Sequence, residues 1–431
     1  MPLSSPAAGT PSGTASTPGG PPTVTPHAPR ERSYQPQSQL PPPSAQPHPS
    51  FPTHNSPRTW LLTSACSPLA VRLIRQLLDH GDYIVACLPP HEIDHPDRGA
   101  EFRELIAECK EGGKDAEGRD RDGWKERIRG IRCDGRGMAG CGAAIAEAVE
   151  VFGRIDIVLC CKSEAVVGTV EELSTTPVTR NLVRDQFENL FFSQVNFIKA
   201  ALPVLREQHT GHIVALTSTG GHIATPGMSM YSAATWGLEG FCDSLAYEVA
   251  PFNIKITIVQ PNQEIQSLTN RLTFAPQIPA YKDAFDSAPN IRDILGNVLN
   301  TDPETAIPRP PTPPATEPVA TPDSDVEDTN LEPDPGRGDV FQRYPRLPPG
   351  AAEKLVMETV HALTAIGGHE NPPARHIVGT DAAIAVREKL KTVSEELEDF
   401  VDASLAVDIF DSEVLDEARE GDRGVEKSPA A

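Results

Sequence analysis

The stretch TWLLTSACSPLAVRLIRQLLDHGDYIVACL, from Thr59 to Leu88, decides the fold. Its two ends, TWLLT and YIVACL, are short apolar runs with the aromatic and β-branched residues that favour strands. The segment between them, PLAVRLIRQLLDHG, has apolar residues at helical spacing. A strand, a helix and another strand in succession predict two parallel strands joined by a crossover helix.

This alternation continues along the chain. Further strand-like runs are IRC, IDIVLCC, HIVALTS and IKITIVQ, and AAIAEAVEVFG is a helical stretch between the first two of them. A last strand is expected from His376 to Val378, around Ile377, between two helices. Because parallel strands with intervening helices bury both faces of a sheet, the sequence predicts an α/β fold with a Rossmann-like, doubly wound parallel sheet of about seven strands. The long connection after the second strand predicts a surface helix near Phe102 to Lys110.

Composition changes at both ends of the chain and inside it. With 44 Pro and only 5% aromatic residues among 431, part of the chain cannot bury enough apolar surface to fold. Residues 1–57, rich in Pro and Ser, predict a disordered arm, and residues 302–340, acidic and Pro-rich, predict a disordered insertion. A charged tail is expected at 412–431. The core then comprises residues 58–301 and, beyond the insertion, 341–411.

Charge and cysteine usage restrict the partners and the location. A net charge of −22 argues against nucleic acid and anionic membranes as main partners, because those surfaces attract clustered Lys and Arg. No apolar run reaches the roughly 18 residues of a membrane helix, and the start lacks a signal-peptide pattern. The eight cysteines have no framework-like spacing, as expected in a reducing compartment. These features predict a cytoplasmic protein, with the nucleus as the alternative.

Short motifs in the low-complexity segments suggest further partners. Thr312-Pro and Thr321-Pro resemble sites for Pro-directed kinases, and Ser324-Asp-Val-Glu resembles a site for an acid-directed kinase. An inert spacer is the alternative interpretation of the insertion. The Pro-rich arm is of the kind that presents a polyproline II helix to SH3-like partners.

A second stretch carries a family resemblance. YSAATWGLEG, from Tyr231 to Gly240, followed by SLAYEVAPFNIKITIVQP, resembles the central helix and following strand of the short-chain dehydrogenase/reductase family. HIVALTS ends at Ser218, thirteen residues before Tyr231, which is the family's spacing between its active Ser and Tyr. Further matches are CD at 133–134, FGRIDIVL at 152–159, GTVEEL at 168–173, ALP at 201–203 and PPARHIVGTDA near the C-terminus. The resemblance implies the family's fold and an NAD(P)-dependent oxidoreductase that acts on an unidentified carbonyl or alcohol.

The resemblance also implies roles for individual residues. Tyr231 is the expected acid/base, and Ser218 is expected to hydrogen-bond the substrate oxygen. The family's Asn maps to Asn189 with a one-residue slip relative to ALP, whereas strict register places Leu190 there. The expected cofactor is NAD or NADP, with no metal. Its expected contacts are Thr63, Ser64, Ser67, Asp134, Cys160 and Pro261.

Two departures from the family pattern bear on the chemistry. The family has a Lys four residues after the Tyr, which lowers the Tyr pKa and holds the nicotinamide ribose, but Thr235 stands here and carries no charge. The Gly-rich cofactor loop becomes TSACSPLA at 63–70, with Ser64, Pro68 and Ala70 in place of three glycines, so that side chains occupy the space of the diphosphate. After the second strand the chain reads LPPHE, with neither a plain ribose carboxylate nor an Arg for a 2′-phosphate.

Lys162 and the cysteines allow more than one interpretation. Lys162, in the CCKS that replaces the family's Asn-Asn-Ala-Gly, is either an exposed loop lysine or points into the nicotinamide site. In the second case it replaces the Lys missing at Thr235 or plugs the pocket. Asp134 either caps the third strand or contacts adenine. Cysteines that fill the core, or that serve a thiol-sensing or metal role, gather at the ends of the first four strands: Cys66, Cys87, Cys133, Cys160 and Cys161.

Two functions therefore stay open. One is an oxidoreductase with a degenerate cofactor site. The other is a catalytically inactive family member, a pseudoenzyme, that works as a binding or regulatory protein. In either case a homo-oligomer through the helix carrying Tyr231 is expected.

Overall fold

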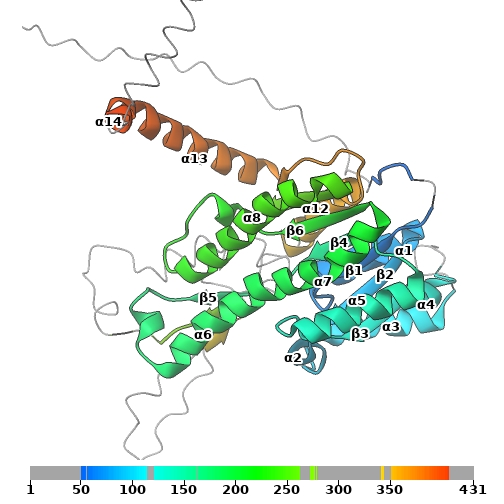
Figure 1. Cartoon of the computed structure of the whole chain (residues 1–431). Helices are drawn as coiled ribbons and strands as arrows, with labels where there is room; N and C mark the ends of the chain where they lie inside the picture. The colour runs from blue at the N-terminus through cyan, green and yellow to red at the C-terminus, as the bar shows by residue number, and fades with distance from the viewer. Residues whose placement is uncertain are drawn as a thin grey trace, which may run out of the picture. The chain divides into compact units, whose positions relative to one another are not determined.

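The computed structural model describes residues 50–113 except 55, 121–262 except 163, 272–278 except 277, 341–343 and 351–406 (Figure 1). The two segments predicted to be disordered, the arm and the insertion, lie mostly or wholly outside these residues, as does the predicted charged tail at 412–431. The kinase-like motifs at Thr312, Thr321 and Ser324 lie outside them as well.

Seven parallel strands form the main sheet, which confirms the predicted Rossmann-like architecture. In spatial order they are β10 (Arg375–Val378), β7 (Ile254–Pro261), β6 (Gly211–Leu216), β4 (Ile157–Cys160), β1 (Thr59–Leu62), β2 (Tyr83–Leu88) and β3 (Ile128–Arg132). The chain starts at β1 and builds outward to β3 before it crosses to β4 on the other side of β1. The carboxyl ends of β1 and β4 therefore meet at a topological switch point, where folds of this kind bind ligands.

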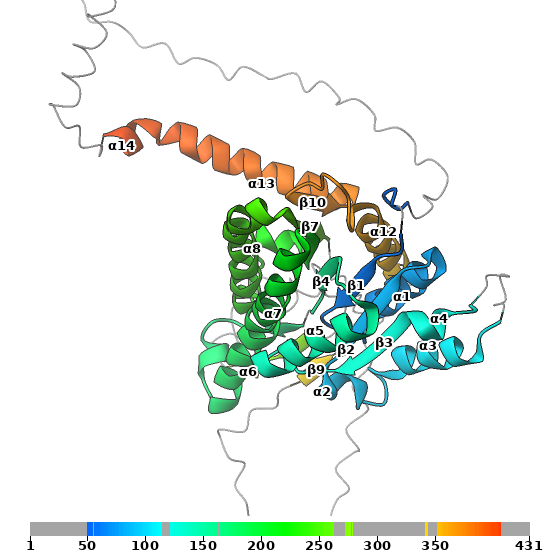
Figure 2. The same cartoon turned by 45° about the vertical axis from the view of Figure 1, so that its right-hand side comes forward.

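Helices cover both faces of this sheet (Figures 1 and 2). Trp60 and Leu62 of β1 belong to the core under α1 (Pro68–His80), and Leu61 points into the opposite core. This alternation is the period of two expected for a strand with two buried faces. The core of α1 also includes side chains of α3 (Ala100–Glu111) and α12 (Ala351–Ile366). The opposite core includes side chains of α5 (Met138–Phe152), α7 (Ser193–Gln208) and α8 (Ser229–Val249).

The first helix shows how the sequence sets the element boundaries. The Ser67 hydroxyl accepts a hydrogen bond from the Ala70 N–H at 3.1 Å and caps the helix. Pro68 occupies the first helical position, where its missing N–H costs no helical hydrogen bond. Gly81 ends the helix with φ 100°, a left-handed conformation that glycine adopts without strain. α3 coincides with the surface helix predicted near Phe102 to Lys110.

A second, smaller sheet was not predicted. Its strands are β5 (Ala165–Val167), β8 (Leu272–Phe274) and β9 (Phe341–Arg343), with β5 and β8 parallel and β9 antiparallel to β8. The main sheet also departs from the prediction at β3, which begins at Ile128 and not at the apolar run IRC. Because β3 lies at the edge of the sheet, its first residues are partly exposed and polar, and they lack an apolar pattern.

The remaining helical elements range from single turns to the 20-residue α13. They are α2 (Pro90–Ile93), α4 (Trp124–Arg127), η1 (Glu172–Ser174), α6 (Pro177–Phe187), η2 (Glu188–Phe192), η3 (Thr219–Gly221), η4 (Ala250–Phe252), α13 (Thr380–Asp399) and α14 (Val401–Leu405). None of the helices among the described residues is both long and apolar enough to cross a membrane.

The start of the packed chain also differs from the prediction. Phe51, in the arm expected to be unpacked up to residue 57, stacks on His80 at the end of α1 with ring centroids 3.6 Å apart. Phe51 also packs against the core of α1. The boundary at 57 is therefore several residues too late, because one aromatic side chain in a Pro-rich segment is enough to anchor it to an exposed helix end.

Candidate active and cofactor site

Ser218 and Tyr231 meet at the carboxyl end of β6. Ser218 follows that strand and caps η3, and Tyr231 lies in the first turn of α8. The Tyr231 hydroxyl donates to Ser218 Oγ at 3.2 Å, and the Gly220 N–H donates to the same oxygen at 3.0 Å. A Cβ at Gly220 would lie 2.8 Å from Ser218 Oγ, so glycine is required there for the backbone to approach. The structure thus brings together the two residues that the thirteen-residue spacing paired.

The surroundings of Tyr231 contain neither a lysine at the family position nor open space. Thr235, one helical turn later on the same face, is only 5% exposed. Tyr231 is 3% exposed and belongs to an apolar cluster with Leu272 and Phe274 of β8. The small second sheet therefore covers the side chain that the resemblance makes the acid/base.

In the loop that replaces the Gly-rich turn, the polar side chains form hydrogen bonds within the protein. Thr63 donates its hydroxyl to Gln194 Oε1 at 2.8 Å and accepts the Cys161 N–H at 3.1 Å. Ser64 donates to Glu92 Oε2 at 3.1 Å. Ser67 caps the helix, because its hydroxyl oxygen accepts a hydrogen bond from the Ala70 N–H. Residues 63–67 are all buried.

Lys162 makes a buried ion pair across this loop. Its ammonium contacts Glu92 Oε1 and lies 3.3 Å from His91 Nε2, both on the short helix after β2. The side chains of Lys162 and Glu92 are 5% and 10% exposed. The carboxylate of Glu92 thus holds the ammonium in this structure, and the replacement of the missing lysine by Lys162 stays a prediction.

The charge of Glu92 depends on this partner. Burial by itself raises the pKa of the Glu92 carboxyl, but the charge and hydrogen bond of Lys162 outweigh burial, and the pKa falls below its ordinary value. Ser64 and His91 act in the same direction. Lys162 thus favours the charged form of the buried Glu92 carboxyl.

Asn189 lies in η2, a π-helical turn between α6 and α7. A π-helical turn holds an extra residue relative to an α-helical one, which accounts for the one-residue slip between Asn189 and ALP. The Asn189 side-chain amide donates to Glu164 Oε1. The Asn189 backbone carbonyl accepts a hydrogen bond from the Ser193 hydroxyl at 2.5 Å.

A pocket of about 250 Å³, counting its solvent-open part, lies between these elements. It brings together four of the residues singled out in the sequence: Thr63, Asp134, Lys162 and Asn189. Lys162 and Glu92 take up the space beside it.

The other expected cofactor contacts have protein partners or are buried. Asp134 forms a bidentate ion pair with Arg136, with a shortest distance of 2.7 Å, and this hydrogen bonding lowers the Asp134 pKa. Cys160 is 1% exposed in the core of the sheet, and burial raises the pKa of its thiol well above the ordinary value. Pro261 is the last residue of β7 and is buried.

These observations test whether the residues fit a dinucleotide, and they do not. At the start of α1, Pro68 has no N–H and the Ala70 N–H is bonded to Ser67, so two donors that normally face a phosphate are missing or used. Ser64 and Lys162 are bonded to Glu92 where the diphosphate would approach. The polar side chains of this loop are therefore bonded to one another.

All eight cysteines are buried and unpaired. This confirms the interpretation of the five at the strand ends as core-filling residues. Burial raises the pKa of the Cys66 thiol to about 12, with the Glu92 charge adding to the effect. Burial likewise raises the pKa of Cys161 to about 11.

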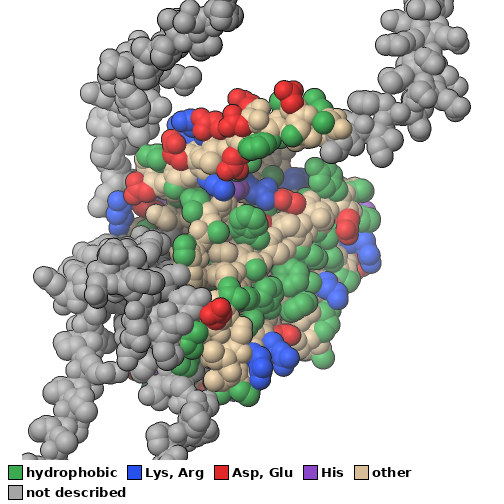
Figure 3. Space-filling model, turned by 90° about the vertical axis from the view of Figure 1, so that its left-hand side faces the viewer, with side chains coloured by type: hydrophobic (Ala, Val, Ile, Leu, Met, Phe, Trp, Pro, Cys, Tyr) green, Lys and Arg blue, Asp and Glu red, His purple; other side chains and the backbone are tan. Residues whose placement is uncertain are grey.

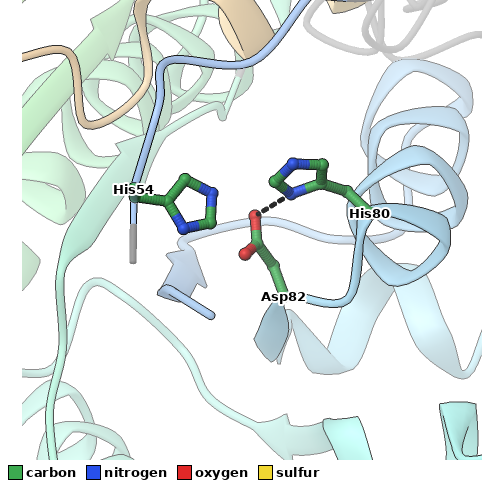
Figure 4. A group of neighbouring side chains, drawn as sticks. All are labelled: His54, His80 and Asp82. Atoms are coloured by element: carbon green, nitrogen blue, oxygen red, sulfur yellow. Dashed lines mark hydrogen bonds and ion pairs between the residues drawn. The ribbon is translucent and has the colours of Figure 1, made fainter. Parts of the chain in front are cut away.

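A group of potential metal ligands lies near the amino end of β2, on the side of the main sheet opposite the candidate site (Figure 4). One ligand atom from each of His54, His80 and Asp82 lies within 4.8 Å of the others. His80 Nδ1 shares a hydrogen bond with Asp82 Oδ2 at 3.4 Å, and Asp82 Oδ1 accepts the Arg58 N–H at 3.0 Å. These contacts account for the positions of the three side chains without a bound ion. Together with the stacking of Phe51 on His80, they hold the segment before β1 against the end of α1.

Comparison with known proteins agrees with the geometry. The model of the short chain dehydrogenase family matches residues 107–267. Oxidoreductase BOA17 of Botryotinia fuckeliana is 30% identical over 204 residues, which are 47% of this chain and 65% of that protein. The 3-ketodihydrosphingosine reductase of Bacteroides thetaiotaomicron is 31% identical over 144 residues, 33% of this chain and 52% of that protein. This chain belongs to the short-chain dehydrogenase/reductase family.

A solved structure extends the likeness to the fold. The short-chain dehydrogenase from Streptomyces avermitilis is 22% identical, with a TM-score of 0.54 over 82% of this chain and 100% of that one. The matches to the two curated relatives span less than two thirds of the length of either. Family membership and fold are thus established, and the activity is a separate question.

One residue of the site escaped the sequence reasoning. Glu92 lies in LPPHE, the segment after the second strand in which the family's ribose contact is sought. Two sequence features could have indicated this pair: a carboxylate four residues after the second strand and a lysine after the fourth strand. Their pairing follows only from the adjacency of these loops at one sheet edge.

Proposed function

We propose that this chain is a catalytically inactive member of its family that acts as a binding or regulatory protein. One observation carries the proposal: the buried ion pair of Lys162 and Glu92, with Ser64 bonded to the same carboxylate, stands where a dinucleotide would bind. A dinucleotide that drew Lys162 away would leave the buried Glu92 carboxylate without its cation, which is costly.

Two further features support the proposal. Thr235 supplies no charge to lower the pKa of the Tyr231 phenol, and the second sheet buries that phenol. The fold and the Ser218–Tyr231 hydrogen bond are then inherited features that hold η3 and α8 together.

The second candidate is an oxidoreductase acting on a carbonyl or alcohol with NAD or NADP. The 3.2 Å hydrogen bond between Tyr231 and Ser218 favours it, since that is the pair such chemistry needs. The name of one relative, 3-ketodihydrosphingosine reductase, suggests a ketone as the substrate. In this case Ser218 would orient the oxygen, Tyr231 would transfer the proton and Asn189 would support the site, and Glu92 would have to release Lys162.

A turnover assay separates the two candidates. The purified full chain is incubated with ketones, aldehydes and alcohols and each of the four nicotinamide dinucleotides, with Tyr231→Phe as the matched control. The proposal predicts no dinucleotide oxidation or reduction above the rate of the Tyr231→Phe variant. Turnover by the wild type that Tyr231→Phe abolishes would establish the second candidate instead.

We also propose that the chain forms homo-oligomers through α8 in the cytoplasm. Hydrophobic side chains gather on one face of the domain (Figure 3). Large apolar side chains exposed on η2 and α8 are Phe192, Trp236 and Tyr247, of which Tyr247 is 85% exposed. Eight unpaired thiols support a reducing compartment.

A further inference from the structure

The last long helix, α13, leaves the domain after two turns. Ala382 and Val386 are buried at its start, next to β10. Every residue from 387 to 406 is exposed. In both views the helix runs on past β10 to α14, away from the main sheet (Figures 1 and 2). Lys391 and Glu395, 3.9 Å apart and one turn apart on the surface, support the helix locally.

Apolar side chains on this exposed part follow one spacing. Leu390, Val393, Leu397 and Phe400 are separated by three, four and three residues. They are 56%, 46%, 64% and 66% exposed, respectively. Residues three and four apart share a helix face, so Leu390, Val393 and Leu397 form a single apolar stripe on α13, and Phe400, the cap residue directly after the helix, continues it. The alternation of three and four is that of the a and d positions of a coiled coil.

Charge is divided along the same helix. Residues 387–391 carry Arg387, Lys389 and Lys391 against Glu388, a net charge of +2. Residues 395–402 carry five carboxylates and no Lys or Arg, a net charge of −5. The last turn of α13 has no basic residue, so its acids face the negative end of the helix dipole. A partner that brings positive charge to this end would relieve that repulsion.

We propose that α13 pairs in antiparallel orientation with α13 of a second copy of this chain. In that orientation the basic start of each helix lies against the acidic end of the other, whereas parallel pairing would place like charges together. The same acidic end disfavours an anionic membrane surface as the occupant of the stripe. This contact lies on a different element from the α8 interface proposed above and does not depend on the catalytic state of the site.

The four exposed residues fix the register. Leu390 lies opposite Phe400 of the partner helix, and Val393 lies opposite the partner's Leu397, so the twofold axis passes near Glu395. This register brings Glu396 close to its own copy across the axis, an unfavourable contact between like charges. The stripe spans fewer than the three to four heptads of an independent coiled coil, so the pairing is weak on its own and adds to other contacts.

Sedimentation of the full chain over a concentration series tests the contact. Leu397→Glu removes two buried leucines per pair and should weaken this association by ~100-fold or more. Thr392→Glu, on the outer face of the same helix, is the matched control and should leave it unchanged. Glu396→Gln should strengthen it, because a like-charge contact is removed on the axis. Equal masses for the wild type and Leu397→Glu at every concentration would overturn the proposal.

Disulfide trapping tests the orientation. The variants Val393→Cys and Leu397→Cys are oxidised separately and as a mixture, with the native cysteines buried. Antiparallel pairing predicts a linked dimer in the mixture, between one chain of each variant, and none in either variant alone. Dimers linked in each variant alone would show parallel pairing, and no linked dimer in any sample would show that the stripe does not pair with itself. Either result would refute the proposal.

Discussion

Lys162→Met should destabilise the protein strongly at neutral pH. It leaves Glu92, 7% exposed, as an uncompensated carboxylate in a closed site. Removing one partner of a buried ion pair costs about 3–5 kcal/mol, a large part of the roughly 5–15 kcal/mol by which a domain is stable. The double variant Lys162→Met/Glu92→Gln removes both charges and should lie within about 1–2 kcal/mol of the wild type.

The effect should also depend on pH with a defined sign. In the wild type the folded-state pKa of Glu92 is lowered, so its contribution to stability is present above the unfolded-state pKa and is lost as the pH falls through the folded-state value. In Lys162→Met the largest influence that lowers this pKa is lost, whereas Ser64 and His91 remain, so burial raises the pKa relative to the wild type and favours the protonated acid. The difference between variant and wild type should therefore be largest near neutral pH and shrink as the pH falls toward about 4.

Urea unfolding at several pH values measures this difference. Trp60 and Trp124 are 1% and 2% exposed, so unfolding will change their fluorescence. A loss below about 1 kcal/mol at pH 7, the range of exposed ion pairs, would refute the buried pair. So would a loss that stays the same at every pH.

Three further predictions follow from other buried groups. Burial lowers the pKa of His212 to about 3, so at mildly acidic pH the unfolded chain binds a proton that the folded chain does not. The free energy of unfolding should therefore fall by about 2–3 kcal/mol between pH 6.5 and 4.5. In urea titrations, His212→Gln should remove most of this dependence of stability on pH. Tyr231→Phe should cost only about 0.5–1.5 kcal/mol in the same assay, the value of one hydrogen bond, and a larger loss would mean that the phenol has a further structural role. None of the eight thiols should react quickly with a disulfide reagent in the folded protein at pH 8, and all should react in denaturant, because all eight are buried and inaccessible to the reagent; rapid modification of any cysteine before unfolding would contradict the burial seen here.

The main sheet was predictable because most of its strands are short apolar runs between turn signals or helices, with β3 at the edge as the exception in its first residues. The helix after β1 was equally clear, since Ser67, Pro68 and Gly81 mark its ends. The second sheet was not predictable. Its strands are three residues long and far apart in sequence, so local patterns carry almost no information on their pairing.

The candidate site divides in the same way. Ser218 and Tyr231 follow from a local spacing, and the structure joins them. Lys162 stood out as a charge at the ligand edge, but the choice between its two inward roles depended on Glu92, seventy residues away. The alignment of Asn189 with the family's Asn depended on a π-helical turn, which no residue pattern in the sequence predicts. Contacts between loops at a sheet edge follow from the fold, and only after the fold is known can they be derived.

Titration of the full wild-type chain with NADPH and with NADH, followed by calorimetry, tests the central claim most directly. An active family dehydrogenase in the same buffer serves as the positive control. If Lys162, Glu92 and Ser64 block the cofactor as proposed, the expected result is no saturable heat for either dinucleotide up to ~1 mM, an affinity weaker than about −4 kcal/mol. Saturable binding of either dinucleotide with a dissociation constant in the low micromolar range, about −8 kcal/mol, would contradict the closed site and favour the oxidoreductase.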